Sequence, residues 1–247
     1  MRHIKPYQEL FESQQGLIQE QIDWLDKCAK RKWKLNRQTG LVDVVGNFDC
    51  SGQGLTDLKG VRFGKVSGVF DCDNNQLTTL VGAPQTVSGN FWCDHNHLTS
   101  LGGAPQSVGG GFDCYLNKLT SLVGAPKTIK GDFRCYLNEL TSLVGAPQSV
   151  GGGFDCEDNQ LTTLVGAPKT VGGSFDCRGN PVSERTLEAI FALMKSGESY
   201  QQALEERWPR MTDEDRVLMY KQMPNLSPED ARKYKALATY NNIKGYL

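Results

Sequence analysis

The chain has 247 residues, and its 27 Lys and Arg residues nearly balance its 28 Asp and Glu residues, which gives a formal net charge of −1. This balance excludes the strongly basic proteins that hold nucleic acid by releasing counterions, so we expect no nucleic-acid partner. No stretch approaches the roughly 18 apolar residues of a membrane span, and the first residues lack the apolar core of a signal peptide. We therefore expect a cytoplasmic protein that does not associate with membranes.

Residues 6–31 carry apolar side chains at a helical spacing, which predicts a helix that docks one face on the segment that follows. We assign residues 1–40 to an N-terminal helical cap. A short basic cluster from Lys30 to Lys34 surrounds Trp33. The sequence leaves two interpretations open for it, a solvated helix end and a contact with phosphate or nucleic acid. The apolar positions of the cap are Tyr7, Leu10, Phe11, Leu17, Ile18, Ile22 and Leu25.

Seven of the eight cysteines recur at an almost constant interval, which is 22 residues from Cys50 to Cys72 and 21 residues at every later step up to Cys177. One cysteine in each repeat indicates a core position, not a pattern of disulfides. No two cysteines are closer than 21 residues, so the short spacings typical of zinc sites are absent. We expect buried free thiols that pack as small apolar side chains.

The cysteines belong to a repeat that reads FDCYLNKLTSLVGAPKTIKGD in its central copy. The first copy has one extra residue and the last is truncated. Self-similarity at this period indicates a solenoid, and we assign residues 41–182 to about seven coils of 21 residues. The copies begin at Phe48, Phe70, Phe91, Phe112, Phe133, Phe154 and Phe175.

Each part of the repeat has an expected structural role. F-x-C has the period-two alternation of a short strand, and successive strands should pair in parallel about 4.8 Å apart, with Phe, Cys and Leu stacked on their counterparts. The asparagine three residues after cysteine, such as Asn117, should satisfy backbone groups where the chain leaves the strand. Ala-Pro predicts an extended return segment without hydrogen bonds, and glycines 109–111 predict a tight turn into the next strand.

The motif F-x-C-x-x-N-x-L-[TS]-x-L resembles the leucine-rich-repeat signature, with Phe and Cys at strand positions that usually hold Leu. The resemblance covers about residues 46–182, and the short unit is similar to repeats of bacterial secreted effectors and, more closely, of bacteriophage-encoded proteins. It implies an α/β solenoid, a leucine-rich-repeat horseshoe with short parallel strands on the concave face and helical caps at both ends. The family uses this scaffold to bind ligands, but the resemblance does not identify the ligand.

After Pro181 the repeat stops, and residues 183–247 carry helix-capping residues such as Ser183 and Ser227. We assign this segment to a C-terminal helical cap that covers the last coil, and a separate effector module is the alternative. Some bacterial effectors join such repeats to a ubiquitin ligase with a catalytic cysteine. No cysteine follows Cys177, so that mechanism is not expected here.

Side chains beside Phe and Cys should point out of the concave strip, so the repeat defines a candidate binding surface. Exposed aromatic residues and Arg surrounded by charge are typical of an interface hot spot, and the alternative is drift on an unused face. The middle coils contribute Trp92, Tyr115, Tyr136, Leu116, Leu137, Arg134 and His95. The surrounding carboxylates are Asp71, Asp73, Asp94, Asp113, Asp155 and Glu157.

The carboxylates indicate a protein partner with a basic surface, although residues 41–182 are only mildly acidic, with 13 acids and 9 bases. The glycine-rich calcium repeat, the EF-hand loop, the P-loop and the common hydrolase motifs are absent, so we predict no metal, no cofactor and no enzyme activity. The resemblance favours an inhibitor of a host or defence protein. A self-associating assembly component and an enzyme with its active groups in the C-terminal helices are the alternatives.

Overall fold

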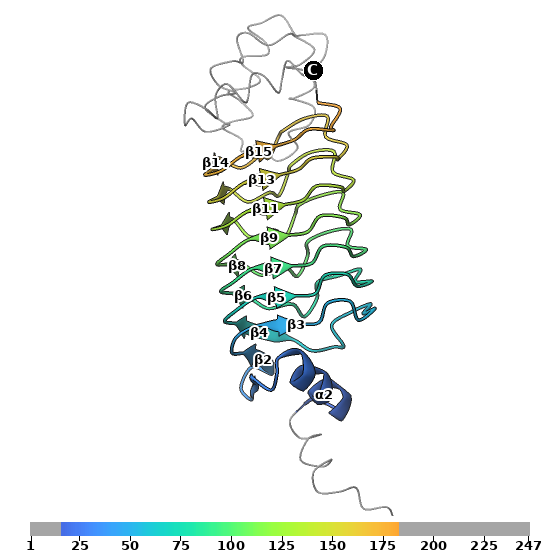
Figure 1. Ribbon diagram of the computed structural model, residues 1–247, viewed down its shortest axis with the longest axis vertical. Coiled ribbons are helices and arrows are strands. Elements are labelled where there is room, and N and C mark those ends of the chain that lie inside the picture. Colours follow the sequence, from blue (N-terminus) through green and yellow to red (C-terminus); the bar gives the residue numbers. More distant parts are fainter. Residues whose placement is uncertain (1–15, 183–247) are drawn as a thin grey trace, which may run out of the picture.

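The structure is a computed structural model that describes residues 16–182. Within this range the chain forms a parallel β-solenoid whose coils stack along the long axis of the molecule (Figure 1). The predicted C-terminal helical cap, residues 183–247, and the first part of the predicted N-terminal cap lie outside the described residues. In the described part, no helix is both long and apolar enough to cross a membrane.

The F-x-C steps form the first of two sheets, which we call the phenylalanine sheet. Its seven parallel strands contain two residues each, and every phenylalanine lies in register with the phenylalanine of the next coil. The predicted strands and their parallel pairing are therefore confirmed. They are β3 (Phe48–Asp49), β5 (Phe70–Asp71), β7 (Phe91–Trp92), β9 (Phe112–Asp113), β11 (Phe133–Arg134), β13 (Phe154–Asp155) and β15 (Phe175–Asp176).

The return arm of each coil forms a second sheet, the valine sheet, which the sequence analysis did not predict. Pro84 lacks a donor, but the next residue does not, and the Gln85 nitrogen donates to the Gly64 oxygen of the preceding coil at 2.8 Å. The expected segment without hydrogen bonds is therefore wrong beyond the proline. The strands are β1 (Trp33–Asn36), β2 (Leu41–Val44), β4 (Phe63–Val66), β6 (Thr86–Val87), β8 (Ser107–Val108), β10 (Thr128–Ile129), β12 (Ser149–Val150) and β14 (Thr170–Val171).

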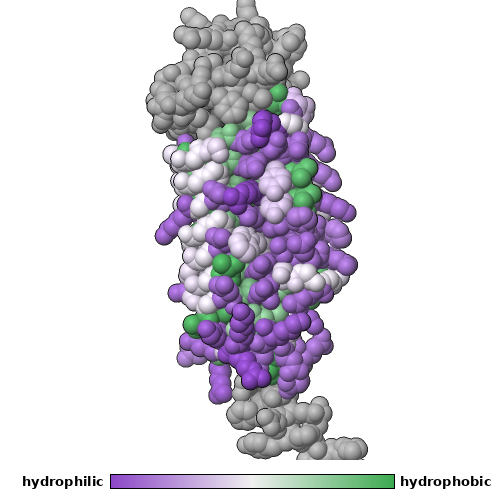
Figure 2. Space-filling view, viewed as in Figure 1, coloured by the Kyte–Doolittle hydropathy of each residue, from purple (hydrophilic) through white to green (hydrophobic). Residues whose placement is uncertain are grey.

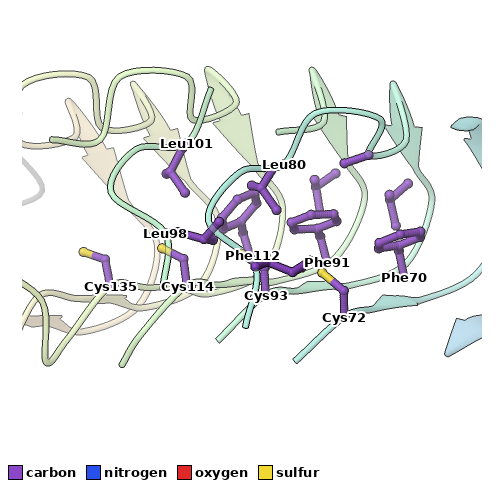
Figure 3. Packing of buried hydrophobic residues seen from close by; sticks show 14 of the residues in the cluster. Phe70, Cys72, Leu80, Phe91, Cys93, Leu98, Leu101, Phe112, Cys114 and Cys135 are labelled. Atoms are coloured by element: carbon purple, nitrogen blue, oxygen red, sulfur yellow. The ribbon is translucent and has the colours of Figure 1, made fainter. Parts of the chain in front are cut away.

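Between the two sheets lies one continuous core. Successive phenylalanine rings from Phe48 to Phe175 have their centroids 5.1 to 5.6 Å apart. The cysteines and leucines form parallel rows beside these rings (Figure 3). All the cysteines are free and buried, as predicted, and Cys72 Sγ donates to the Trp92 oxygen at 3.2 Å. Burial raises the pKa of the Cys72 thiol well above its usual value, so it stays protonated.

The asparagines three residues after each cysteine satisfy backbone hydrogen-bonding groups where the chain leaves the phenylalanine sheet, as predicted. Asn117 Oδ1 accepts from the Leu98 nitrogen at 2.9 Å, and Asn117 Nδ2 donates to the oxygens of Cys93, Cys114 and Tyr115 at 3.0, 3.2 and 3.3 Å. One amide thus ties two adjacent coils together in the core. The same donor pattern recurs at Asn75, Asn96, Asn138, Asn159 and Asn180.

The glycine step before each strand allows two coils to approach closely. A Cβ on Gly109 would collide with the Ser88 oxygen of the preceding coil. The predicted tight passage into the strand is explained by this close approach of backbones.

The N-terminal end of the solenoid is covered by helix α2 (Gln19–Cys28) and then by a hairpin. Leu25 is fully buried, and the Trp24 ring lies edge-on to Phe48 with centroids 5.2 Å apart. Ile18, which was expected to dock, is 63% exposed. The predicted helical cap is also wrong after α2, since β1 and β2 pair as antiparallel strands with period-two burial. Of the basic cluster, Lys30, Arg31 and Lys32 lie between α2 and β1, and Lys34 lies within β1.

Candidate functional site

The side chains beside Phe and Cys form the outer surface of the phenylalanine sheet, as the strand alternation predicts. We call the central part of this surface, at coils β7, β9 and β11, the aromatic patch. Small green and pale areas stand out there among mainly purple, hydrophilic side chains (Figure 2). The patch consists of Trp92, Tyr115, Tyr136 and Arg134, which are half-buried, and of His95, Leu116 and Leu137, which are exposed.

Two stacked tyrosines form the middle of the aromatic patch. The Tyr115 and Tyr136 rings have centroids 4.3 Å apart and planes only 9° apart, and the His95 ring lies edge-on to Tyr115 at 5.4 Å. Burial raises the pKa of both phenols, and the Asp94 carboxylate raises that of Tyr115 further. Both tyrosines are therefore neutral at physiological pH and offer a flat surface with hydroxyl groups for hydrogen bonding.

Beside the tyrosines, Leu116 and Leu137 combine exposure with an unfavourable backbone conformation. Their φ angles are 50° and 53°, and 38% and 42% of their surfaces are exposed. The left-handed conformation costs an ordinary L-residue roughly 1–2 kcal/mol. Neither the solvent exposure nor the left-handed backbone conformation favours leucine at these positions. Both leucines therefore oppose local stability.

The same backbone conformation recurs two residues after cysteine in every coil of the phenylalanine sheet. Sequence reasoning missed it, although the residue types carried a signal, because this column is rich in residues that tolerate positive φ. Only the two central leucines break that preference so strongly. Reading from the N-terminal coil, the column contains Gly52, Asn74, His95, Leu116, Leu137, Asp158 and Gly179.

Two of the predicted surface carboxylates are buried, which corrects the sequence analysis. Asp94 is 3% exposed, and its Oδ2 lies 2.9 Å from His95 Nδ1. Asp113 is 8% exposed and accepts two hydrogen bonds of 3.2 Å from Arg134, whose guanidinium also donates to Asp132. Longer side chains of the same or the next coil contact both carboxylates. Asp94 and Asp113 therefore position His95 and Arg134, and neither is itself a contact surface.

The remaining carboxylates differ in whether a cation accompanies them. Glu157 lies 3.5 Å from Arg178, which pairs more closely with Asp176. Asp71 and Asp73, in contrast, form no ion pair with any described residue. Asp155, which also forms no ion pair with any described residue, is half-buried on β13, and burial raises its pKa. Coil β5 thus presents two carboxylates without an ion pair beside the aromatic patch.

Asp71 should make the stability of the protein depend on pH. Burial, followed by the neighbouring carboxylates, raises its pKa to about 6 from 3.8. The folded protein then binds a proton at Asp71 more tightly than the unfolded chain does. The stability that this proton contributes is fully present below pH 3.8 and is lost as the pH rises through about 6. We expect the free energy of unfolding to increase from pH 7 to pH 5. Urea denaturation across this range measures it.

Asp71→Asn is the matched control, because the amide oxygen can still accept the Asp73 nitrogen, which lies 3.1 Å from Asp71 Oδ1. The variant should be more stable than wild type at pH 7, and the difference should shrink as the pH falls. A difference between the two proteins that does not change with pH would refute the role of Asp71.

Within residues 16–182 no group of three or more His, Cys, Asp or Glu side chains is placed to hold a metal ion. The buried thiols have raised pKa values, which removes the thiolate that a nucleophile requires. The sequence matches no protein-family profile, and a comparison with curated proteins finds no match.

Proposed function

We propose that this protein is a non-enzymatic binding module of the leucine-rich-repeat type, and that the aromatic patch is where a partner protein docks. The observation that carries the proposal is the pair Leu116 and Leu137, exposed and in the left-handed conformation in adjacent coils. A partner that covers both side chains gains apolar burial that the free protein lacks.

The composition of the patch supports a binding surface over drift. Stacked Tyr115 and Tyr136 lose little conformational freedom when a partner covers them, because they already hold each other in place. Arg134 is likewise fixed by Asp113 and Asp132. Tyr, Trp and Arg are the residues that most often dominate interface energies. Drift would not favour rigid aromatic side chains beside strained leucines.

The partner that fits this surface is a protein with a basic face, because the unpaired carboxylates at coil β5 border the aromatic patch. The resemblance to bacterial effector and bacteriophage repeats leads us to propose a bacterial host or defence protein in the cytoplasm, which the module inhibits. We further propose the finer features that this resemblance implies, a horseshoe curvature and helical caps at both ends.

Affinity capture from bacterial lysate tests the proposal, with the wild type beside Trp92→Ala, Tyr115→Ala and Tyr136→Ala combined. The triple variant should remain folded, since these side chains lie outside the core, and should lose the captured protein. Hot-spot truncations cost about 2 kcal/mol or more each, so the combined loss of affinity should exceed about 1,000-fold. Equal capture by both proteins would place the binding surface elsewhere, and capture of the chain itself would indicate self-association.

A further inference from the structure

The two arginines on the outer surface of the phenylalanine sheet, Arg134 and Arg178, both lie on the C-terminal side of Trp92. On the C-terminal side of Trp92, Arg134 and Arg178 each lie within 4 Å of two carboxylates. On the N-terminal side, Asp71 and Asp73 have no basic partner in the described part of the chain. A cation from a partner that lies beside Trp92 would therefore find carboxylates that no arginine shares. The other carboxylates of this surface without an ion pair, Asp49, Asp155 and Asp158, lie farther along the solenoid from Trp92.

Trp92 lies at the border between these carboxylates and the rest of the aromatic patch. It is paired in register with Asp71 on the neighbouring strand, and both side chains point away from the core and are half-buried. An ammonium or guanidinium group placed there would meet an aromatic ring and a carboxylate from adjacent strands. Both attract a cation, and partial burial strengthens the attraction to each.

The component along the solenoid axis of the separation between this position and the exposed leucines follows from the strand order. Strands β5, β7, β9 and β11 are consecutive neighbours, so the coils of Leu116 and Leu137 are two and three strand spacings from Asp71. At about 4.8 Å per spacing this axial component is roughly 10 to 14 Å. An extended peptide that runs along the solenoid axis covers this distance in about three or four residues, at roughly 3.3 Å each.

We propose that the aromatic patch recognises an extended peptide segment in which a Lys or Arg is three or four residues from a large apolar side chain. The cation lies between Trp92 and Asp71, and the apolar side chain covers Leu116 and Leu137. A helix would need about seven to nine residues to make the same two contacts. An extended segment therefore loses the conformational entropy of fewer residues when it binds. This inference rests on the proposed function and specifies its ligand.

Selection of random linear peptides on the full-length protein tests the proposal, with counter-selection against Leu116→Asn combined with Leu137→Asn. Enriched peptides should contain a basic residue three or four positions from an apolar or aromatic one. A synthetic peptide of the enriched sequence should bind about tenfold more weakly to Asp71→Asn combined with Asp73→Asn, which removes both unshared charges without changing side-chain size. Asp158→Asn, an exposed carboxylate beyond the patch, is the control and should bind as wild type.

The outcomes separate this inference from the proposed function. Some enriched peptides could require the leucine pair and yet be acidic, lack the basic residue, or carry it at a helical spacing. Such peptides would overturn the proposal of an extended basic segment and leave the proposed binding patch in place. Affinity unchanged in the Asp71 and Asp73 variant would do the same. No enrichment, or enrichment that does not depend on the leucine pair, would overturn both.

Discussion

Phe112→Ala should lower the free energy of unfolding by about 3–5 kcal/mol, the usual cost of removing a large aromatic side chain from a core. Phe112 is fully buried, and its ring lies between those of Phe91 and Phe133, with centroids 5.1 and 5.4 Å away. The cavity cannot close easily, because the hydrogen bonds of the two sheets fix the spacing of the coils. Chemical denaturation followed by circular dichroism measures the loss.

Phe112→Leu is the matched control, because leucine is apolar and fills most of the space that phenylalanine occupies. We expect a loss below about 1.5 kcal/mol for this substitution. If the alanine variant lost no more stability than the leucine variant, the continuous ring stack would not be the main source of stability in the central coils.

Leu116→Asn combined with Leu137→Asn should separate binding from stability. Asparagine tolerates positive φ, so relief of backbone strain offsets the apolar burial that is lost, and stability should stay within about 1 kcal/mol of wild type. Binding of the partner should fall about 100-fold or more, since two apolar anchors are removed from the centre of the surface. Thermal unfolding and titration with the captured protein give the two quantities.

The repeat itself made most of the fold predictable. Strict spacing of Phe, Cys and Asn identified which side chains stack in the core, since a repeated position in a solenoid meets its own copies. The valine sheet was missed because its strands from β6 onward are only two residues long. In addition, the missing donor of Pro84 led us to overlook the hydrogen bond that the next residue donates. The hairpin β1–β2 was missed because a helical pattern was extended beyond Cys28.

The candidate site was only partly predictable. The columns of outward residues followed from strand alternation, but Asp94 and Asp113 were assigned to the surface because alternation alone does not show how far a neighbouring Tyr115 or Arg134 extends. The stacking of Tyr115 on Tyr136 depends on rotamers, which the sequence does not specify. The strain at the leucines could be recognised only from the backbone angles, although glycine and asparagine at the same position of other coils indicated a positive φ.

Titration of the captured partner against three proteins tests the central claim most directly: wild type, Leu116→Asn combined with Leu137→Asn, and Asp158→Asn. Asp158 has the same backbone conformation one coil further on, with φ of 49°, so it controls for changes at this column. The account predicts that the leucine variant loses binding while it unfolds at nearly the wild-type denaturant concentration, and that Asp158→Asn binds normally. Full binding by a folded leucine variant would contradict the account.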